Sequence, residues 1–309
     1  MNIKYLNVVG LDGNVIIKKG GASGGGGSSK PKWTGHADVE GLKAIGWTDE
    51  DIAYYQENGV NWNEEDDQYH KVPEDNIALY GVLTADNIST YKDRIVYLPK
   101  IDTSGKTSMS SMFDSCSSLV SIPQLDTAKV TNMSRMFNSC YSLVSIPQLD
   151  TANVTDMGNM FYNCYSLVSI PQLDTANVTD MGNMFQNCYS LVSVPQLDTV
   201  NVMRMYQMFA NCYSLVSIPQ LDTANVTDMG NMFYNCYSAR TANLKGLIQS
   251  LQINKTYLLE KDSLLYIINS EAATSAITIT LSSYCYTKYA NDPDVVAALS
   301  NHPNISLAS

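Results

Sequence analysis

The chain has 309 residues, of which 45% are hydrophobic and 16% are charged, a composition typical of a globular protein. Its 19 basic and 30 acidic residues give a formal net charge of -11, which argues against nucleic acid and anionic lipid as general partners. No run approaches the roughly 18 apolar residues needed to cross a bilayer, so we expect no membrane insertion.

The first segment with a recognisable pattern is a hairpin. Two short strands are predicted over 3–9 and 15–18, joined by a turn at Asp12 and Gly13. Such a hairpin is too small to be stable alone, and we interpret 1–19 as an attachment segment for a particle or assembly partner. These residues lack the unbroken apolar region of a secretory signal, so we expect that the chain does not use the general secretory route.

Residues 20–32 are rich in glycine and serine, which is typical of a flexible linker. The next segment, 33–94, is predicted to be a helical N-terminal cap. Asp38 can cap a helix over 39–45, and Thr48 can cap a second helix over 52–57. All tryptophans of the chain fall in this segment, and their large apolar area suits a cover over the open end of a stack.

From about residue 95 the sequence repeats every 24 residues. The text LVSIPQLDTANVTDMGNMFYNCYS begins at Leu143 and again, unchanged, at Leu215. Two residue types keep this interval and form the predicted structural core, namely the cysteines Cys116, Cys140, Cys164, Cys188, Cys212 and Cys236 and the phenylalanines Phe113, Phe137, Phe161, Phe185, Phe209 and Phe233.

A 24-residue unit cannot bury its apolar side chains alone. If each unit makes one coil and the next coil stacks on it, every apolar side chain meets its counterpart above and below. The Leu-Val-Ser-Ile segment suits a short strand, about 4.8 Å from the same segment of the next coil and parallel to it. A second extended piece is predicted over 154–157, and the Met-Phe-x-x-Cys spacing is that of about one helical turn.

The motif L-x-x-I-P-x-L-D-T-x-x-V-T-x-M-x-x-M-F-x-x-C-x-S resembles the BspA-type leucine-rich repeat of bacterial surface proteins, over about 95–238. The resemblance implies an α+β fold, a leucine-rich-repeat solenoid of stacked 24-residue coils with short parallel strands between two caps. It also implies adhesion, because members of this family are mostly adhesins that contact host proteins or other cells.

The repeat pattern ends at Ala239, and residues 239–309 are predicted to be a mixed C-terminal cap, since terminal repeats of such arrays are usually atypical. Strands are expected over 257–268 and 277–281. Asp292 and Pro293 are expected to open a helix that runs through Leu299.

Two columns of potential ligand atoms have competing interpretations. The cysteines could be core thiols, disulfides or metal ligands, and core thiols are favoured because equivalent side chains of stacked coils point in parallel. The aspartates of the Asp-Thr pairs could bind calcium or cap their own turns, and capping is favoured because each stands at a predicted corner. A second aspartate column is interrupted by Arg204. No cofactor is predicted.

The candidate ligand-binding residues are exposed aromatic side chains and one charge. A tyrosine follows five of the repeat cysteines, and such a stripe could contact a protein or stack on sugar faces, or the rings could pack on one another for stability. The copy from Leu191 departs from its neighbours, which indicates either a specific contact patch or drift. The candidates are Tyr141, Tyr165, Tyr189, Tyr213, Tyr237, Arg204 and Tyr206.

Catalysis finds no support, because the three histidines are far apart in sequence and outside the repeats. We therefore predict a non-enzymatic recognition or adhesion module that binds a cell-surface protein or glycan through the solenoid. The favoured setting is the virion surface of a bacteriophage, as a fibre or decoration protein. The alternatives are a bacterial cell-surface or secreted adhesin and a purely structural spacer, and a homo-oligomer is compatible with each.

Overall fold

The computed structural model describes residues 84–92, 95, 98, 101–270 and 276–309. The predicted hairpin over 1–19, the linker over 20–32 and the cap helices over 39–45 and 52–57 lie outside the described residues. The described part of the predicted cap contains helix α4 (Ile88–Tyr91), whose Ile88 is buried in the core.

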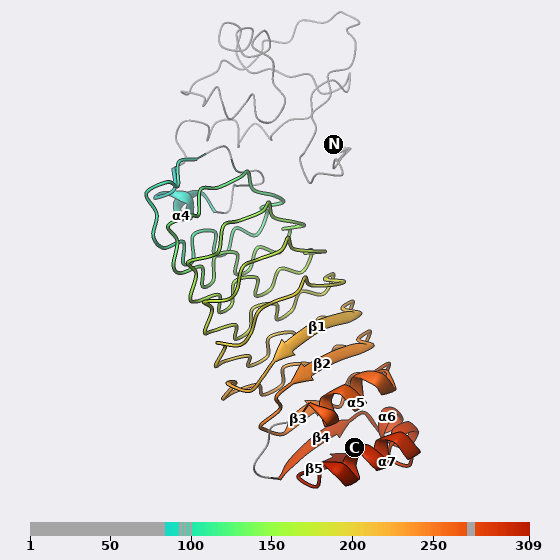
Figure 1. The fold of residues 1–309 in the computed structure, drawn as a ribbon. Coiled ribbons are helices and arrows are strands. Elements are labelled where there is room, and N and C mark those ends of the chain that lie inside the picture. The colour runs from blue at the N-terminus through green and yellow to red at the C-terminus, as the bar shows by residue number, and fades with distance from the viewer. Residues whose placement is uncertain (1–83, 93–94, 96–97, 99–100, 271–275) are drawn as a thin grey trace, which may run out of the picture.

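The repeats form a stack of coils in which each residue lies beside the residue 24 positions later (Figure 1). In the first ladder of the stack, the backbone N–H of Val168 donates to the carbonyl of Val144 at 3.1 Å, and that of Val192 donates to Val168 at 3.2 Å. The second ladder consists of parallel bridges that run from Ser108 through Asn132, Asp156, Asp180 and Arg204 to Asp228. The predicted solenoid with short parallel extended segments is thereby confirmed.

The stack continues beyond the predicted repeat boundary at residue 238. Strand β1 (Ser217–Asp222) pairs in parallel with β2 (Thr241–Lys245), and the N–H of Arg240 donates to the carbonyl of Val216 at 2.8 Å. The register of this pair shifts between Ile218 and Leu221. Pro219 lies there and has no N–H to donate, so the sheet is interrupted at that point in the coil.

The Met-Phe-x-x-Cys segment is not helical, so the expectation of a helical turn was wrong. Along 157–164 the backbone N–H groups alternate between two kinds of acceptor. Asn159 and Phe161 donate to the next coil at 2.8 and 2.9 Å, whereas Met160 and Cys164 donate three residues back at 3.2 and 3.1 Å. These turns need left-handed residues, and Asn159 and Asn163 have φ of 58° and 62°, which asparagine tolerates better than most residues.

The core consists of the apolar columns. Neighbouring phenylalanine rings are stacked with centroids 5.3 to 5.9 Å apart and planes within 7° of parallel. The repeat cysteines are buried free thiols, and five of them donate to the carbonyl of a phenylalanine 27 residues earlier, as Cys188 does to Phe161 at 3.1 Å. All twelve residues of the predicted core set are buried.

After residue 245 the coils change type. Strands β3 (Leu251–Ile253), β4 (Ile277–Leu281) and β5 (Ile305–Ala308) form a parallel sheet in that order, with partners 28 residues apart, as Leu251 and Ile279 are. Helices α5 (Lys261–Asn269), α6 (Ser283–Tyr289) and α7 (Pro293–Asn301) lie in the connections. The C-terminal region is therefore mixed, and its strand over 277–281 is as predicted.

The helix predicted after Asp292 is confirmed, because Asp292 caps α7 by accepting the N–H of Asp294 at 3.0 Å. The strand predicted over 257–268 was wrong, because most of that range is α5. Leu264, Ile267 and Ile268 recur at the three- and four-residue spacing of one helical face, and they are buried where α5 packs against β2.

Candidate interaction surface

The five candidate tyrosines form one column of parallel rings. The centroids of Tyr141 and Tyr165 are 4.8 Å apart, those of Tyr165 and Tyr189 are 4.7 Å apart, and those of Tyr189 and Tyr213 are 4.9 Å apart. The planes of these pairs lie within 7° of parallel. The rings therefore pack on one another, as one of the two interpretations expects, and the stripe still reaches the surface.

The stacking decides which part of each ring is available. Tyr165, Tyr189 and Tyr213 each have a ring on both sides, so their faces are covered and their edges point outward. Partial burial raises the pKa of Tyr165 and Tyr189, and the neighbouring hydroxyls raise it further because two adjacent phenolates would repel. The column is therefore a neutral row of ring edges and hydroxyls.

A column of exposed valines runs beside the tyrosines. Val144, Val168, Val192 and Val216 each follow a tyrosine of the stripe by three positions and are 37% to 45% exposed. The backbone N–H of each donates to the carbonyl of the valine 24 residues earlier, which for Val144 is Val120. We call these four valines and the five tyrosines the tyrosine–valine face. The valines were not among the sequence candidates, although their recurrence beside a buried leucine was a usable signal.

Four of the five segments that carry this face contain no charged residue. In the coils of Tyr141, Tyr165, Tyr189 and Tyr213 the nine residues from tyrosine to leucine read Tyr-Ser-Leu-Val-Ser-Ile-Pro-Gln-Leu, with valine in place of isoleucine at position 194. The segment from Tyr237 departs from this pattern, because it contains the exposed Arg240 and Lys245. In a chain with a net charge of -11, these four segments carry no carboxylate. Exposed apolar and aromatic side chains that recur along one side of a chain segment are typical of protein contact sites.

The aromatic column extends past the repeats. The ring of Tyr257 stacks on that of Tyr237 with centroids 6.1 Å apart. Sequence reasoning missed Tyr257 because it follows Tyr237 by 20 residues instead of 24, and because 257–268 was expected to be a strand. The shorter interval matches the local coil, since the N–H of Glu260 donates to the carbonyl of Arg240, also 20 residues earlier. Leu258, which follows Tyr257, is also exposed.

The other two candidates lie elsewhere on the coil. Arg204 belongs to the second ladder and pairs through Nη2 with Oδ2 of Asp180 at 2.7 Å. Tyr206 follows it by two residues and lies against Gly230, because a Cβ added to that glycine would come within 3.3 Å of the tyrosine ring. The structure therefore separates Arg204 and Tyr206 from the tyrosine–valine face.

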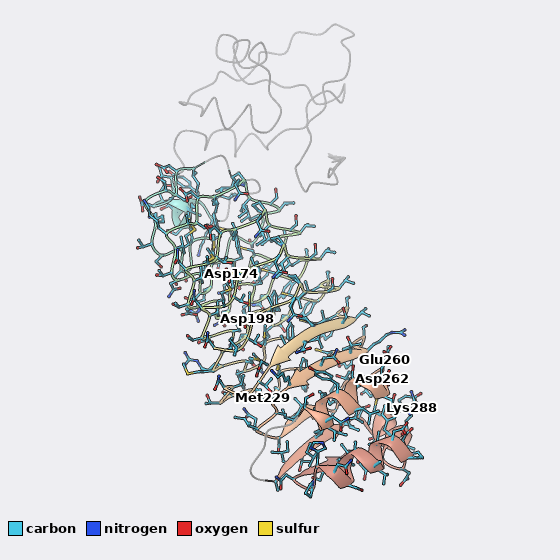
Figure 2. The ribbon with its side chains drawn as sticks, viewed as in Figure 1. Asp174, Asp198, Met229, Glu260, Asp262 and Lys288 are labelled. Atoms are coloured by element: carbon cyan, nitrogen blue, oxygen red, sulfur yellow. The ribbon has the colours of Figure 1, made fainter. Side chains whose placement is uncertain are left out.

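The aspartates of the Asp-Thr pairs cap their own turns. The Oδ1 atoms of Asp174 and Asp198 each accept the N–H two residues later at 3.1 Å, and these residues lie on consecutive coils (Figure 2). The equivalent bond is present at Asp126, Asp150 and Asp222. In the described part of the chain, no three His, Cys, Asp or Glu side chains are grouped so that they could hold a metal ion.

The thiols of the core are protonated and unreactive. Burial raises the pKa of Cys140, Cys164, Cys188 and Cys212 well above its usual value, and burial raises the pKa of Cys236 to about 12. A neutral thiol is a poor nucleophile and a poor metal ligand, so this column supports the stack and offers no reactive site. Among the described residues, none of the helices is both long and apolar enough to span a membrane.

The chain is similar to a known protein family and to a solved structure. A family model described as "Mycoplasma protein of unknown function, DUF285" matches residues 86–193 and 166–252. Together these matches cover more than half of the chain. A comparison with curated proteins found no match. Among solved structures, a leucine-rich repeat protein of T. pallidum aligns over 70% of this chain and 87% of its own, with 15% identity and a TM-score of 0.31.

Proposed function

This chain belongs to the DUF285 family, whose model matches the coils described above, and we propose that it is a non-enzymatic recognition module that binds a protein ligand through the tyrosine–valine face. One observation carries the proposal, namely that four consecutive coils present exposed valines and tyrosine edges on segments without charge. Tyrosine is enriched at protein interfaces, and charged residues are depleted at their centres.

The backbone makes this face well suited to recognition. The valines are fixed by hydrogen bonds between coils at 3.0 to 3.2 Å, and the tyrosine rings are fixed by their neighbours at 4.7 to 5.5 Å. Side chains that are already ordered lose little conformational entropy when a ligand binds, so more of the contact energy contributes to affinity.

Ring stacking favours a protein ligand over a glycan. A sugar binds an aromatic side chain by lying on the ring face, and both faces of Tyr165, Tyr189 and Tyr213 are covered by neighbouring rings. The ring edges, hydroxyls and valines that remain exposed suit the mixed apolar and polar surface of a protein.

As the setting, we propose the virion surface of a bacteriophage, with the module as a fibre or decoration protein. This proposal is supported by the sequence pattern of a short hairpin over 1–19 and a glycine-rich stretch over 20–32, which would tether a recognition module to a particle. A bacterial surface or secreted adhesin is the alternative setting. Mass spectrometry of purified virions and of washed uninfected cells distinguishes the two, and absence of the chain from the virions would refute the phage setting.

The binding proposal is tested with the labelled full chain on a panel of intact bacterial cells, before and after protease treatment, and on a glycan array. A variant that combines Val168→Ser, Val192→Ser and Val216→Ser should lose at least tenfold in cell binding. A second variant with Tyr165→Ser, Tyr189→Ser and Tyr213→Ser should do the same. Protease treatment of the cells should abolish binding by the native chain.

The matched control is Ala152→Ser with Ala176→Ser, which changes exposed residues at a corner of the coil away from the face. It should bind as the native chain does. Unchanged binding by both face variants, with circular dichroism showing that they are folded, would refute the proposal. If binding survives protease treatment and appears on the glycan array, the ligand is a sugar and not a protein. If the native chain binds neither the cells nor the array, the remaining role is that of a structural spacer.

A further inference from the structure

One coil breaks the repeat on its outer surface. At four positions where the two neighbouring coils carry alanine, threonine, aspartate and glycine, the coil of residues 191–214 carries Val200, Met203, Arg204 and Tyr206. Val200 is 46% exposed, Met203 50% and Tyr206 38%. Three small or polar positions have thus become large and apolar without gaining burial. Core packing does not account for side chains that remain this exposed.

Two of the new side chains, those of Arg204 and Tyr206, contact residues of the coils on either side. Arg204 reaches back to Asp180 of the preceding coil at 2.7 Å, while the ring of Tyr206 lies over Gly230 of the following coil. A Cβ at Gly230 would be 3.3 Å from Cδ2 and 3.4 Å from Cε2 of that ring, so the glycine allows the ring to lie close to the backbone. These contacts hold Arg204 and Tyr206 in place before any partner binds.

Tyr206 differs from the tyrosines of the stripe in having no stacked neighbour. Each stripe tyrosine is in a ring pair, whereas Tyr206 is in no ring or cation contact within the described part of the chain. With 38% of the residue exposed, its ring is available to a partner. An exposed tyrosine ring attracts a lysine or arginine through its negative face.

The charges around the patch favour a basic partner. Arg204 is paired with Asp180, so these two charges compensate each other. Asp228, the next residue of the same ladder, is exposed and bonds to the N–H of Gly230 at 3.0 Å. Among the described residues it has no cationic partner. The uncompensated charge beside the apolar side chains is thus negative, as is the net charge of the chain.

We propose that Val200, Met203, Arg204, Tyr206 and Asp228 form a second docking surface, the coil-191 patch, which binds a basic, apolar-containing segment of a protein partner. An apolar side chain of the partner packs on Met203 and Val200, and a lysine or arginine lies over Tyr206 within reach of Asp228. Methionine adapts to the shape of the incoming side chain, and tyrosine and arginine are enriched among the residues that dominate binding energy.

The patch is distinct from the tyrosine–valine face because it is built on the second ladder. Within the described coils, its large apolar side chains also occur together once, whereas the face repeats from coil to coil. A single irregular coil can fix the position of a partner that a periodic surface would hold in several equivalent registers. The proposal therefore does not depend on the ligand proposed for the face.

The test starts from a phage-displayed library of 12-residue peptides selected on the immobilised full chain. Peptides are removed if they also bind a reverted variant, in which Val200→Ala, Met203→Thr, Arg204→Asp and Tyr206→Gly restore the residues of the neighbouring coils. Selected peptides should carry lysine or arginine beside an aromatic or aliphatic residue. The affinity of a synthetic copy is then measured by fluorescence anisotropy against further variants.

Met203→Thr with Tyr206→Gly should lower the affinity for the synthetic peptide at least tenfold. Asp228→Asn should lower this affinity about threefold to tenfold, with less effect at high salt. Moving the patch back by one coil, with Ala176→Val, Thr179→Met, Asp180→Arg and Gly182→Tyr on the reverted background, should restore binding. The triple Tyr165, Tyr189 and Tyr213 serine variant should bind the peptide unchanged, which separates this result from the face.

Three results would overturn the proposal. The first is a selection that yields no peptide able to distinguish the native chain from the reverted variant. The second is enrichment of acidic peptides, which would mean that Arg204 and not Asp228 sets the charge preference. The third is self-association of the native chain in sedimentation velocity that the reverted variant lacks, because the occupant would then be a second copy of this chain.

Discussion

The hydroxyl of Thr175 makes two hydrogen bonds to the backbone of Asp198 on the next coil. Its Oγ1 donates to the carbonyl of Asp198 at 2.8 Å and accepts the N–H of the same residue at 2.8 Å. Thr151 and Asp174 repeat the arrangement, as do Thr199 and Asp222. The Asp-Thr pair thus serves two functions, since aspartate caps its own corner while threonine joins that corner to the adjacent coil.

Thr175 offers a direct test of this link. Thr175→Val keeps the shape of the buried side chain but leaves an N–H and a carbonyl of Asp198 without their partner, so unfolding free energy should fall by about 2 kcal/mol. Thr175→Ser keeps the hydroxyl and should cost less than about 1 kcal/mol. Urea unfolding measures both, and equal losses in the two variants would show that the hydrogen bonds do not stabilise the corner.

The left-handed turns predict a stabilising substitution. Arg135 has a φ of 58° at the position where three of the four later coils carry asparagine and the other carries Gln207. Such backbone costs an ordinary side chain about 1 kcal/mol. Arg135→Asn should therefore raise the unfolding free energy by about 0.5 kcal/mol or more. Arg135→Ala removes the same charge and side chain without supplying the amide, and it should give no gain. If alanine stabilised as much as asparagine, the backbone explanation would fail.

An asparagine ladder stabilises the other left-handed column. Asn187 donates from Nδ2 to Oδ1 of Asn163 at 2.6 Å, and it accepts from Asn211 at 2.6 Å. Asn187→Gly keeps the backbone conformation accessible but removes both bonds, so it should cost about 2 kcal/mol in thermal unfolding. Asn159→Gly changes a left-handed residue outside this ladder and should cost less than half as much. If the two variants lost similar amounts of stability, the loss would come from the backbone entropy of glycine and not from the hydrogen bonds of the ladder.

The buried thiols predict alkaline sensitivity. Their folded pKa is raised by burial, so between about pH 9 and 12 the unfolded chain releases protons that the folded chain keeps. The contribution of the buried, protonated thiols to the free energy of unfolding is thus complete below about pH 9. It is lost as pH rises toward 12, at about 1.4 kcal/mol per pH unit for each thiol. Cys188→Ala should reduce this slope by that amount in urea unfolding between pH 9 and 10.5.

The control for this prediction is Met184→Leu, which alters a buried side chain of the same region that does not titrate. It should change stability equally at every pH and leave the slope as in the native chain. A slope that is the same in the Cys188→Ala variant and in the native chain would mean that other groups cause the alkaline unfolding.

The stacked columns could be predicted from the sequence, because residues 24 positions apart occupy equivalent places on adjacent coils and therefore lie in contact. An apolar side chain that recurs at one interval, such as Phe161 and Phe185, can be buried by its own copy whatever the local backbone is. The same logic placed the tyrosines in one stripe. The valines could have been included, since they recur at the same interval and next to a buried leucine.

The turns and the C-terminal coils were harder to predict for physical reasons. A Met-Phe-x-x-Cys spacing suits a helix, and only the asparagines at Asn159 and Asn163 signal left-handed turns instead. After residue 245 the interval between paired strand residues becomes 28, so the 24-residue pattern no longer predicts which residues lie side by side. Helix α5 and the position of Tyr257 therefore depend on contacts that the repeat pattern does not encode.

The central claim is that every repeat adds one coil to a continuous stack, and spin-label distances in the full chain test it most directly. Nitroxides are attached to cysteines introduced in pairs, with the partly exposed Val120 paired either with the exposed Val216 or with the exposed Arg240. The native thiols are buried and stay unlabelled. Double electron–electron resonance should give narrow distributions whose means differ by about 5 Å, the spacing of adjacent parallel segments. Broad distributions, or an increment of about 10 Å or more, would contradict the stack.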